Sequence, residues 1–185
     1  LKERLDIEQT KNIAARNDLA TRGINAMYPP NGLSPMKCDY DYDTQIGTDD
    51  TVALQGLINY ATTLGLTITI PKPCLILGNI DLKEGVRLNG INWQVSKKET
   101  GTNRRKFKGS VIILRGAQFT LRASSSVKDF TVFYDQQKYF LNADATKPDG
   151  LEDFTDYPAT FLINSGNGGG FELENINYFG GSTIV

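Results

Sequence analysis

The chain has no histidine among its 185 residues, and this absence removes several kinds of chemistry. A Ser-His-Asp triad, the commonest zinc ligand and the usual proton shuttle at neutral pH all need an imidazole side chain. Cysteine is also scarce, because Cys38 and Cys74 are the only two. Two cysteines make no disulfide framework, so we read them as free thiols of a protein made in a reducing compartment. We expect no cofactor and no bound metal.

Long apolar runs and an excess of one charge are missing as well. No stretch is long enough to cross a bilayer, and none reads as a secretory signal peptide. The 20 Lys and Arg residues nearly balance the 21 Asp and Glu residues, so the net charge is −1. We therefore expect neither membrane insertion nor a general affinity for nucleic acid. Glycine is abundant, with 18 residues, as in chains whose many short strands need turns.

A capped helix is predicted to begin within residues 47–55, which read Gly-Thr-Asp-Asp-Thr-Val-Ala-Leu-Gln. Thr48 or Asp49 can accept backbone N–H bonds at the helix start, and Gly65 suits a left-handed C-terminal residue. Gly56 falls inside the helix, where we expect a close approach to another backbone to offset its cost. The apolar residues of this segment recur with the spacing of one helix face. They are Leu54, Leu57, Ile58, Ala61 and Leu64.

Only short strands are predicted after this helix. Their uneven spacing and their Gly and Asn turns favour parallel strands in stacked coils, although no exact internal repeat is visible. A β-sandwich built from hairpins is the alternative, but the Asn-Gly and Asp-Gly pairs do not lie between paired alternating strands. The predicted strands are 67–70, 74–77, 79–82, 86–89, 111–115, 118–122, 129–134, 160–163, 171–178 and 182–185.

The order of these segments resembles the start of the pectate-lyase-like superfamily. There, Gly-Asp-Gly-x-x-Asp-Asp-Thr-x-Ala-x-Gln opens a capping helix, and x-Val-x-Ile-Pro and Val-x-Leu-x-Gly strands follow. The equivalents here are residues 47–55, 67–71 and 86–90, and the resemblance covers residues 39–90. It departs at residues 45–47, where the family has a glycine pair. The resemblance implies a mainly β fold over residues 38–185, namely a single-stranded right-handed parallel β-helix closed by a capping helix.

The N-terminal part is predicted to be separate from this β domain. Residues 1–27 read as a helical neck, in which Leu5, Asn12 and Leu19 share one heptad position. This helix is either a trimeric coiled coil or a single solvated helix. Residues 28–37 read as a linker. Because the chain lacks an initial Met and stops inside a predicted strand, we expect it to be part of a larger protein.

Two loops carry candidate contacts. Residues 94–109 are rich in Lys and Arg and could contact an acidic polysaccharide or nucleic acid, or form a solvated loop or a salt-bridge partner for a neighbouring subunit. Residues 135–158 combine carboxylates with aromatic rings, as sugar-binding sites do. Alternatively, this is a surface loop whose rings pack on the strands beneath. The candidate substrate-binding residues are Tyr139, Asp144, Asp149, Glu152, Asp153 and Tyr157.

The order of helix, linker and capping helix is similar to that of bacteriophage tailspikes. Such proteins are homotrimers of the virion tail, made in the host cytoplasm and joined to other tail proteins through their N-terminal end. They bind bacterial surface polysaccharide, capsule or O-antigen, and many degrade it by hydrolysis or β-elimination. Their catalytic residues follow no fixed motif, so none is assigned, and we expect the active site to lie outside this chain. The alternatives are a secreted pectinase or glucanase, and a non-enzymatic connector of a tail fibre.

Overall fold

The computed structural model describes residues 6–7, 9–13, 23–91, 94–98, 105–137, 155–164 and 169–181, with backbone alone for 94–98 and 105. One long helix, α2 (Thr51–Leu64), lies among short strands. The strands are β1 (Ile24–Asn25), β2 (Thr67–Ile70), β3 (Cys74–Ile76), β4 (Ile80–Leu82), β5 (Arg87–Gly90), β6 (Gln94–Lys98), β7 (Arg105–Lys108), β8 (Val111–Leu114), β9 (Phe119–Leu121), β10 (Ser126–Phe133), β11 (Phe161–Ile163) and β12 (Glu172–Phe179).

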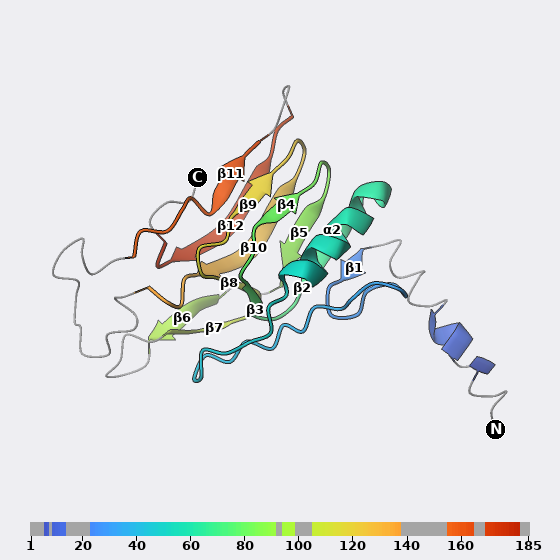
Figure 1. Ribbon diagram of the computed structural model, residues 1–185, viewed down its shortest axis with the longest axis horizontal. Coiled ribbons are helices and arrows are strands. Elements are labelled where there is room, and N and C mark those ends of the chain that lie inside the picture. The colour runs from blue at the N-terminus through green and yellow to red at the C-terminus, as the bar shows by residue number, and fades with distance from the viewer. Residues whose placement is uncertain are drawn as a thin grey trace.

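Most strands belong to two parallel sheets (Figure 1). The larger, seven-stranded sheet has the order β1-β2-β5-β10-β8-β3, and β12 pairs with β10 off this path. The smaller sheet has the order β11-β9-β4. Strands β6 and β7 form an antiparallel pair of their own. Parallel neighbours need long connections between them, so each strand pairs with residues far away in the sequence.

The predicted right-handed parallel β-helix is wrong. The fold is mixed α/β with parallel sheets, and the larger sheet curves as a half-barrel. Strand β10 is the reason, because Ser126–Lys128 pair with β5 whereas Thr131–Phe133 pair with β8. Strand β10 thereby joins β5 and β8 into a single sheet. In a solenoid these two strands would belong to separate faces. The alternative β-sandwich also fails, because both of these sheets are parallel, whereas sandwiches are antiparallel.

The predicted helix is confirmed as α2, with Gly65 in the left-handed conformation at its C-terminus. Leu54, Leu57, Ile58 and Ala61 are buried as expected, but Leu64 is 55% exposed. The N-cap residue is Asp50, not Thr48 or Asp49, and its side chain makes no capping hydrogen bond, although Asp49 accepts the backbone N–H of Thr51 at 3.0 Å. Figure 1 shows α2 beside the end of the large sheet that contains β1 and β2.

The expected close backbone approach at Gly56 is wrong, because a Cβ added there meets nothing within 4 Å. Glycine in a helix interior costs backbone entropy that no contact offsets at this position. We therefore expect Gly56→Ala to raise the free energy of unfolding by about 1 kcal/mol. Urea denaturation followed by circular dichroism measures this change. If the variant is only as stable as the parent protein, or less stable, the space around Gly56 is not free.

Two hydrophobic clusters lie on opposite faces of the strands β3, β8 and β10. The main cluster includes α2, the inner residues of both sheets and Tyr134. The second cluster includes Tyr40, Leu75, Val111, Ile113 and Phe133, and it is covered by Phe107 of β7. The Phe107 ring lies 4.9 Å from the Phe133 ring. Both faces of β8 are therefore covered, which explains why all four of its residues are buried.

The N-terminal segment differs from the predicted neck and linker. Residues 6–7 and 9–13 are helical, but β1 (Ile24–Asn25) falls within the predicted helix 1–27, so the helix prediction is wrong at this end. In the predicted linker 28–37, Met36 is fully buried in the main core. This segment is therefore packed against the sheet and does not act as a free spacer. The coiled coil of the neck stays a prediction, as does the homotrimer.

Candidate functional site

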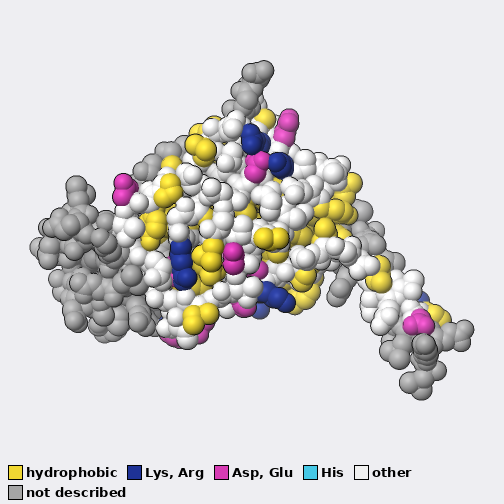
Figure 2. Space-filling model, in the orientation of Figure 1, with side chains coloured by type: hydrophobic (Ala, Val, Ile, Leu, Met, Phe, Trp, Pro, Cys, Tyr) yellow, Lys and Arg dark blue, Asp and Glu magenta, His cyan; other side chains and the backbone are white. Residues whose placement is uncertain are grey.

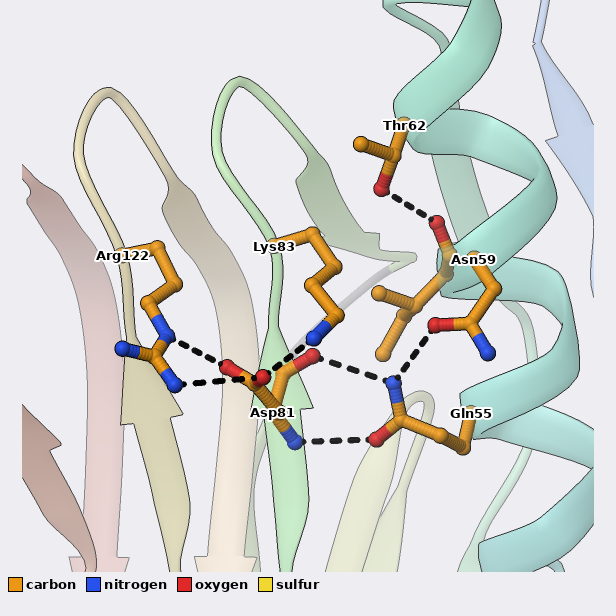
Figure 3. Close-up of polar contacts among 7 residues, drawn as sticks. Gln55, Asn59, Thr62, Asp81, Lys83 and Arg122 are labelled. Carbon is orange, nitrogen blue, oxygen red and sulfur yellow. Dashed lines mark hydrogen bonds and ion pairs between the residues drawn. The ribbon is translucent and has the colours of Figure 1, made fainter.

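A group of polar side chains lies where α2 meets the ends of β4 and β9 (Figure 3). We call it the Asp81 cluster, and its members are Gln55, Asn59, Asp81, Lys83 and Arg122. Figure 2 shows basic and acidic side chains gathered on the visible face over this part of the molecule. None of these residues was selected from the sequence. The available signal was the alternation of apolar and charged residues in 80–83, which predicts that Asp81 and Lys83 point away from the core.

Gln55 ties the helix to strand β4. Its side-chain oxygen accepts the backbone N–H of Asp81 at 2.9 Å, and its side-chain nitrogen donates to the Asp81 carbonyl at 3.1 Å. The same nitrogen donates to the Asn59 side-chain oxygen at 3.1 Å. No described strand pairs with β4 on this side. The amide of Gln55 takes the place of such a strand, since it pairs with one donor and one acceptor of the backbone. These bonds fix the positions of Asn59 and Asp81.

The Asp81 carboxylate holds two cations. Arg122 donates from Nε at 2.7 Å and from Nη2 at 3.3 Å, and Lys83 forms a short ion pair with the same carboxylate. The pKa of Asp81 is lowered, first by the hydrogen bond from Arg122. Because the side chains of Lys83 and Arg122 are 40% and 38% exposed, they remain accessible from solvent. The cluster carries one negative and two positive charges, a net charge of +1.

The solvent side of this cluster presents donors. Among the described residues, no partner accepts a hydrogen bond from Arg122 Nη1 or from the Asn59 amide nitrogen. The Lys83 ammonium has three hydrogens, and one carboxylate does not satisfy all of them. The Asp81 cluster is therefore suited to a ligand rich in acceptor oxygens and carrying negative charge.

A second polar group is buried around Asp135, which has no exposed surface. Its carboxylate accepts hydrogen bonds from Arg115 Nε at 3.0 Å and Nη2 at 2.6 Å, and from the Tyr40 hydroxyl at 2.6 Å. Arg115 Nη2 also donates to the Gln45 carbonyl at 2.7 Å. The pKa of Tyr40 is raised, first by burial and then by the hydrogen bond to Asp135. These four residues tie together three distant parts of the chain.

No family model matches the chain, and no curated protein or solved structure matches it either.

Only one of the candidate substrate-binding residues lies in the described part of the chain. Tyr157 is half-buried, and its ring centre lies 4.5 Å from that of Tyr134. Burial raises the pKa of Tyr157. Its ring therefore packs on the core, as in the alternative interpretation of this loop. The others lie outside the described residues, namely Tyr139, Asp144, Asp149, Glu152 and Asp153.

The basic segment 94–109 contains the hairpin of β6 and β7, where the sequence suggested a loop. Lys106 forms an ion pair with Asp43 at 2.5 Å within the same chain. The neighbouring carboxylates of Asp39 and Asp41 hold turns, since they accept hydrogen bonds from Thr48 and Asp43. Across the described residues, no group of three or more metal-ligating acidic or cysteine side chains converges.

Among the described residues, the second buried carboxylate belongs to Asp50, which is 2% exposed. It accepts the backbone N–H groups of Lys37 at 2.7 Å and Cys38 at 2.9 Å. Burial raises the pKa of Asp50. Its partners are backbone groups of the N-terminal segment, so Asp50 fastens that segment to the start of α2.

Within the described ranges, no helix is long and apolar enough to cross a membrane.

Proposed function

We propose that this chain is the host-attachment segment of a bacteriophage tailspike and that it binds acidic bacterial surface polysaccharide. The observation that carries the proposal is the Asp81 cluster, with its donors held in place and its net charge of +1. The side-chain amide of Gln55 fixes the backbone of Asp81 by hydrogen bonds. The Asp81 carboxylate in turn orients Arg122 and Lys83 through ion pairs. A site whose side chains are already ordered loses little conformational entropy when a flexible sugar chain binds.

Binding is better supported than catalysis in the described part of the chain. Glycoside hydrolysis needs one carboxylic acid that donates a proton and a second carboxylate roughly 5 to 9.5 Å away. Asp81 is paired with Arg122, which lowers the pKa of this carboxyl and removes the proton that an acid would donate. The side chain of Asp135 has no exposed surface and does not face a substrate. We therefore place any depolymerase active site of the parent protein outside the described residues.

The assignment to a virion rests on the order of helix, linker and capping helix over residues 1–65, which is similar to that of bacteriophage tailspikes. Both cysteines are free and buried, in keeping with synthesis in a reducing host cytoplasm. A homotrimer would present three copies of the Asp81 cluster to one repeating polymer. Three linked weak sites bind a polymer far more tightly than one site does, provided that the spacing allows simultaneous contact.

The proposal predicts selective binding of a carboxylated polysaccharide. We expect the protein to bind polygalacturonate fragments in isothermal titration calorimetry and to bind neutral dextran much more weakly. Lys83→Ala and Arg122→Ala should each reduce the affinity for polygalacturonate about tenfold, because a hydrogen bond to a charged group contributes about 1.5 kcal/mol or more.

Lys72→Ala is the matched control, because Lys72 is an exposed cation outside the cluster, in the turn between β2 and β3. It should leave the affinity unchanged. If Lys72→Ala weakens binding as much as Arg122→Ala, the attraction is diffuse and the Asp81 cluster is not the site. The connector function, in contrast, predicts no saturable binding of either polysaccharide.

A further inference from the structure

The two cysteines of the chain lie together in the main core. Cys38 is 5% exposed and Cys74 has no exposed surface, and both belong to the same hydrophobic cluster. Their thiols interact, since the Cys38 thiol is the first cause that raises the pKa of Cys74 well above its ordinary value, and burial is the second. The Cys74 sulfur also lies 3.6 Å from the carbonyl oxygen of Val111. Both cysteines are free thiols in this structure.

Asp50 connects the backbones that carry the two thiols. Its carboxylate accepts the backbone N–H of Cys38 at 2.9 Å, and its own backbone N–H donates to the carbonyl of Leu75 at 2.9 Å. Leu75 directly follows Cys74, and it also forms a parallel bridge with Asp49. A disulfide forms only between cysteines whose backbones are held close together. The hydrogen bonds of Asp50 provide this condition for Cys38 and Cys74.

The backbone of Cys38 has an unusual conformation that places its side chain in the core. Its φ is 46°, in the left-handed region, which residues other than glycine adopt only where the surrounding structure imposes it. The neighbouring side chains of Lys37 and Asp39 are exposed, whereas Met36 and Cys38 are buried. The bend therefore directs one thiol inward from a segment whose adjacent side chains face solvent.

Hydrogen bonds at both ends attach residues 24–38 to the rest of the fold. Strand β1 contributes only two paired residues, and the backbone N–H of Ala26 donates to the Thr69 carbonyl at 2.9 Å. The other end is held by the hydrogen bond from Cys38 to Asp50. Short attachments of this kind open locally at a low free-energy cost. A covalent bond at Cys38 would prevent such opening.

We propose that Cys38 and Cys74 form a reversible disulfide that locks residues 24–38 onto β3 when the protein leaves a reducing compartment and meets a peroxide. A peroxide is small enough to reach Cys38, the more exposed of the two thiols. The inference stands apart from the Asp81 cluster and does not depend on sugar binding.

The reaction takes place in two steps. The Cys38 sulfur attacks one oxygen of hydrogen peroxide, the O–O bond breaks, and a sulfenic acid and one water form. The Cys74 sulfur then attacks the Cys38 sulfur, the S–O bond breaks, and a second water leaves with the Cys74 proton. The two thiols are oxidised by two electrons and the peroxide is reduced to two waters. A small dithiol reverses the reaction by thiol–disulfide exchange.

The first test follows the two thiols in the full chain. One sample is treated with hydrogen peroxide and another with dithiothreitol, and both are then unfolded in urea with N-ethylmaleimide. The oxidised chain should weigh two hydrogens less than the reduced chain and take up no maleimide, and peptide mapping should find Cys38 joined to Cys74. Dithiothreitol should restore both thiols. Cys74→Ala is the control, and it should form no such product.

The second test measures whether the bond locks the segment. Trypsin cleaves after the exposed Lys37 only when the backbone leaves Asp50, so the disulfide should slow this cleavage about tenfold or more. Cleavage after Lys11, which is exposed and precedes residues 24–38, should keep its rate. The thermal midpoint should rise by about 10 °C, because the bond closes the loop between residues 38 and 74.

Three outcomes would overturn the proposal. In the first, the cysteines gain oxygen without the loss of two hydrogens. In the second, non-reducing electrophoresis shows a disulfide between two chains. In the third, cleavage after Lys37 is equally fast in the oxidised and the reduced protein, which would mean that the bond locks nothing. The comparison of oxidised with reduced parent protein needs no variant, so the result does not depend on how well Cys74→Ala folds.

Discussion

Asp135→Ala is expected to lower the free energy of unfolding by about 3–5 kcal/mol. The Asp135 carboxylate is completely buried and accepts hydrogen bonds from Arg115 and Tyr40. Alanine removes the partner of a guanidinium whose side chain is only 27% exposed, and it leaves the buried Tyr40 hydroxyl without its acceptor. The loss of stability arises mainly because the Arg115 guanidinium and the Tyr40 hydroxyl are left buried without an acceptor, and less from the lost attraction between Asp135 and Arg115. Urea denaturation at neutral pH, followed by tryptophan fluorescence and circular dichroism, measures the change.

Asp43→Ala is the matched control for this prediction. Asp43 also pairs with a cation, Lys106, but its side chain is 67% exposed. An exposed ion pair contributes about 0–1 kcal/mol, so this variant should be nearly as stable as the parent protein. Equal losses for Asp135→Ala and Asp43→Ala would mean that water replaces the missing carboxylate around Arg115, and the buried network would then not hold the three chain segments together.

Gly90→Ala is expected to destabilise the protein by about 3 kcal/mol, at the upper end of the range for overpacking a closed site. A Cβ at Gly90 would lie 2.0 Å from the carbonyl oxygen of Asp129 and 2.9 Å from Cβ of Ser110. The oxygen belongs to the backbone at the bend of β10, so a rotamer change does not relieve the clash. Gly90 is the last residue of β5, and the bend of β10 at Asp129 lies directly against it.

Gly56→Ala serves as the control for Gly90→Ala, because the same substitution at Gly56 meets free space. The two variants should change the free energy of unfolding in opposite directions. Thermal unfolding by differential scanning calorimetry compares them directly. A loss below about 1 kcal/mol for Gly90→Ala would show that the bend at Asp129 moves without cost, since overpacking a rigid site costs about 1–3 kcal/mol.

The local elements were largely predictable from the residues. Helix α2 follows from the spacing of Leu54, Leu57, Ile58 and Ala61, and its end follows from Gly65. Most predicted strands agree with the observed ones within one or two residues, as β2 and β5 illustrate. The predicted strand 182–185 lies outside the described residues. Local periodicity was sufficient here because each of these elements buries one face against the core.

The error in the fold arose at one strand. The sequence predicted a strand over 129–134, but β10 starts at Ser126 and continues through the bend at Asp129. Asp129 is the first residue of the predicted strand, whereas in the structure it forms a left-handed bend inside β10. The missed residues Ser126–Lys128 are those that pair with β5. Without them the sheet appears divided, and with them it is continuous.

The candidate site was missed for a related reason. Gln55, Asp81 and Arg122 are far apart in the sequence, and no local pattern relates a helix residue to the ends of two strands. The sequence could show that Asp81 and Lys83 face outward, but not that Arg122 would meet them. The signal that was followed instead, the mixture of acids and rings in 135–158, led for Tyr157 to core packing against Tyr134.

The residues alone determined the chemistry that is excluded, the helix α2 and the positions of the short strands. These depend on side-chain composition and on periods of about two or 3.6 residues, which are local properties. The tertiary structure decided which strands join, where the sheet curves and which charges meet. In a parallel sheet these depend on hydrogen bonds between backbones separated by long connections, and the register of those bonds is set by the packing of the whole core.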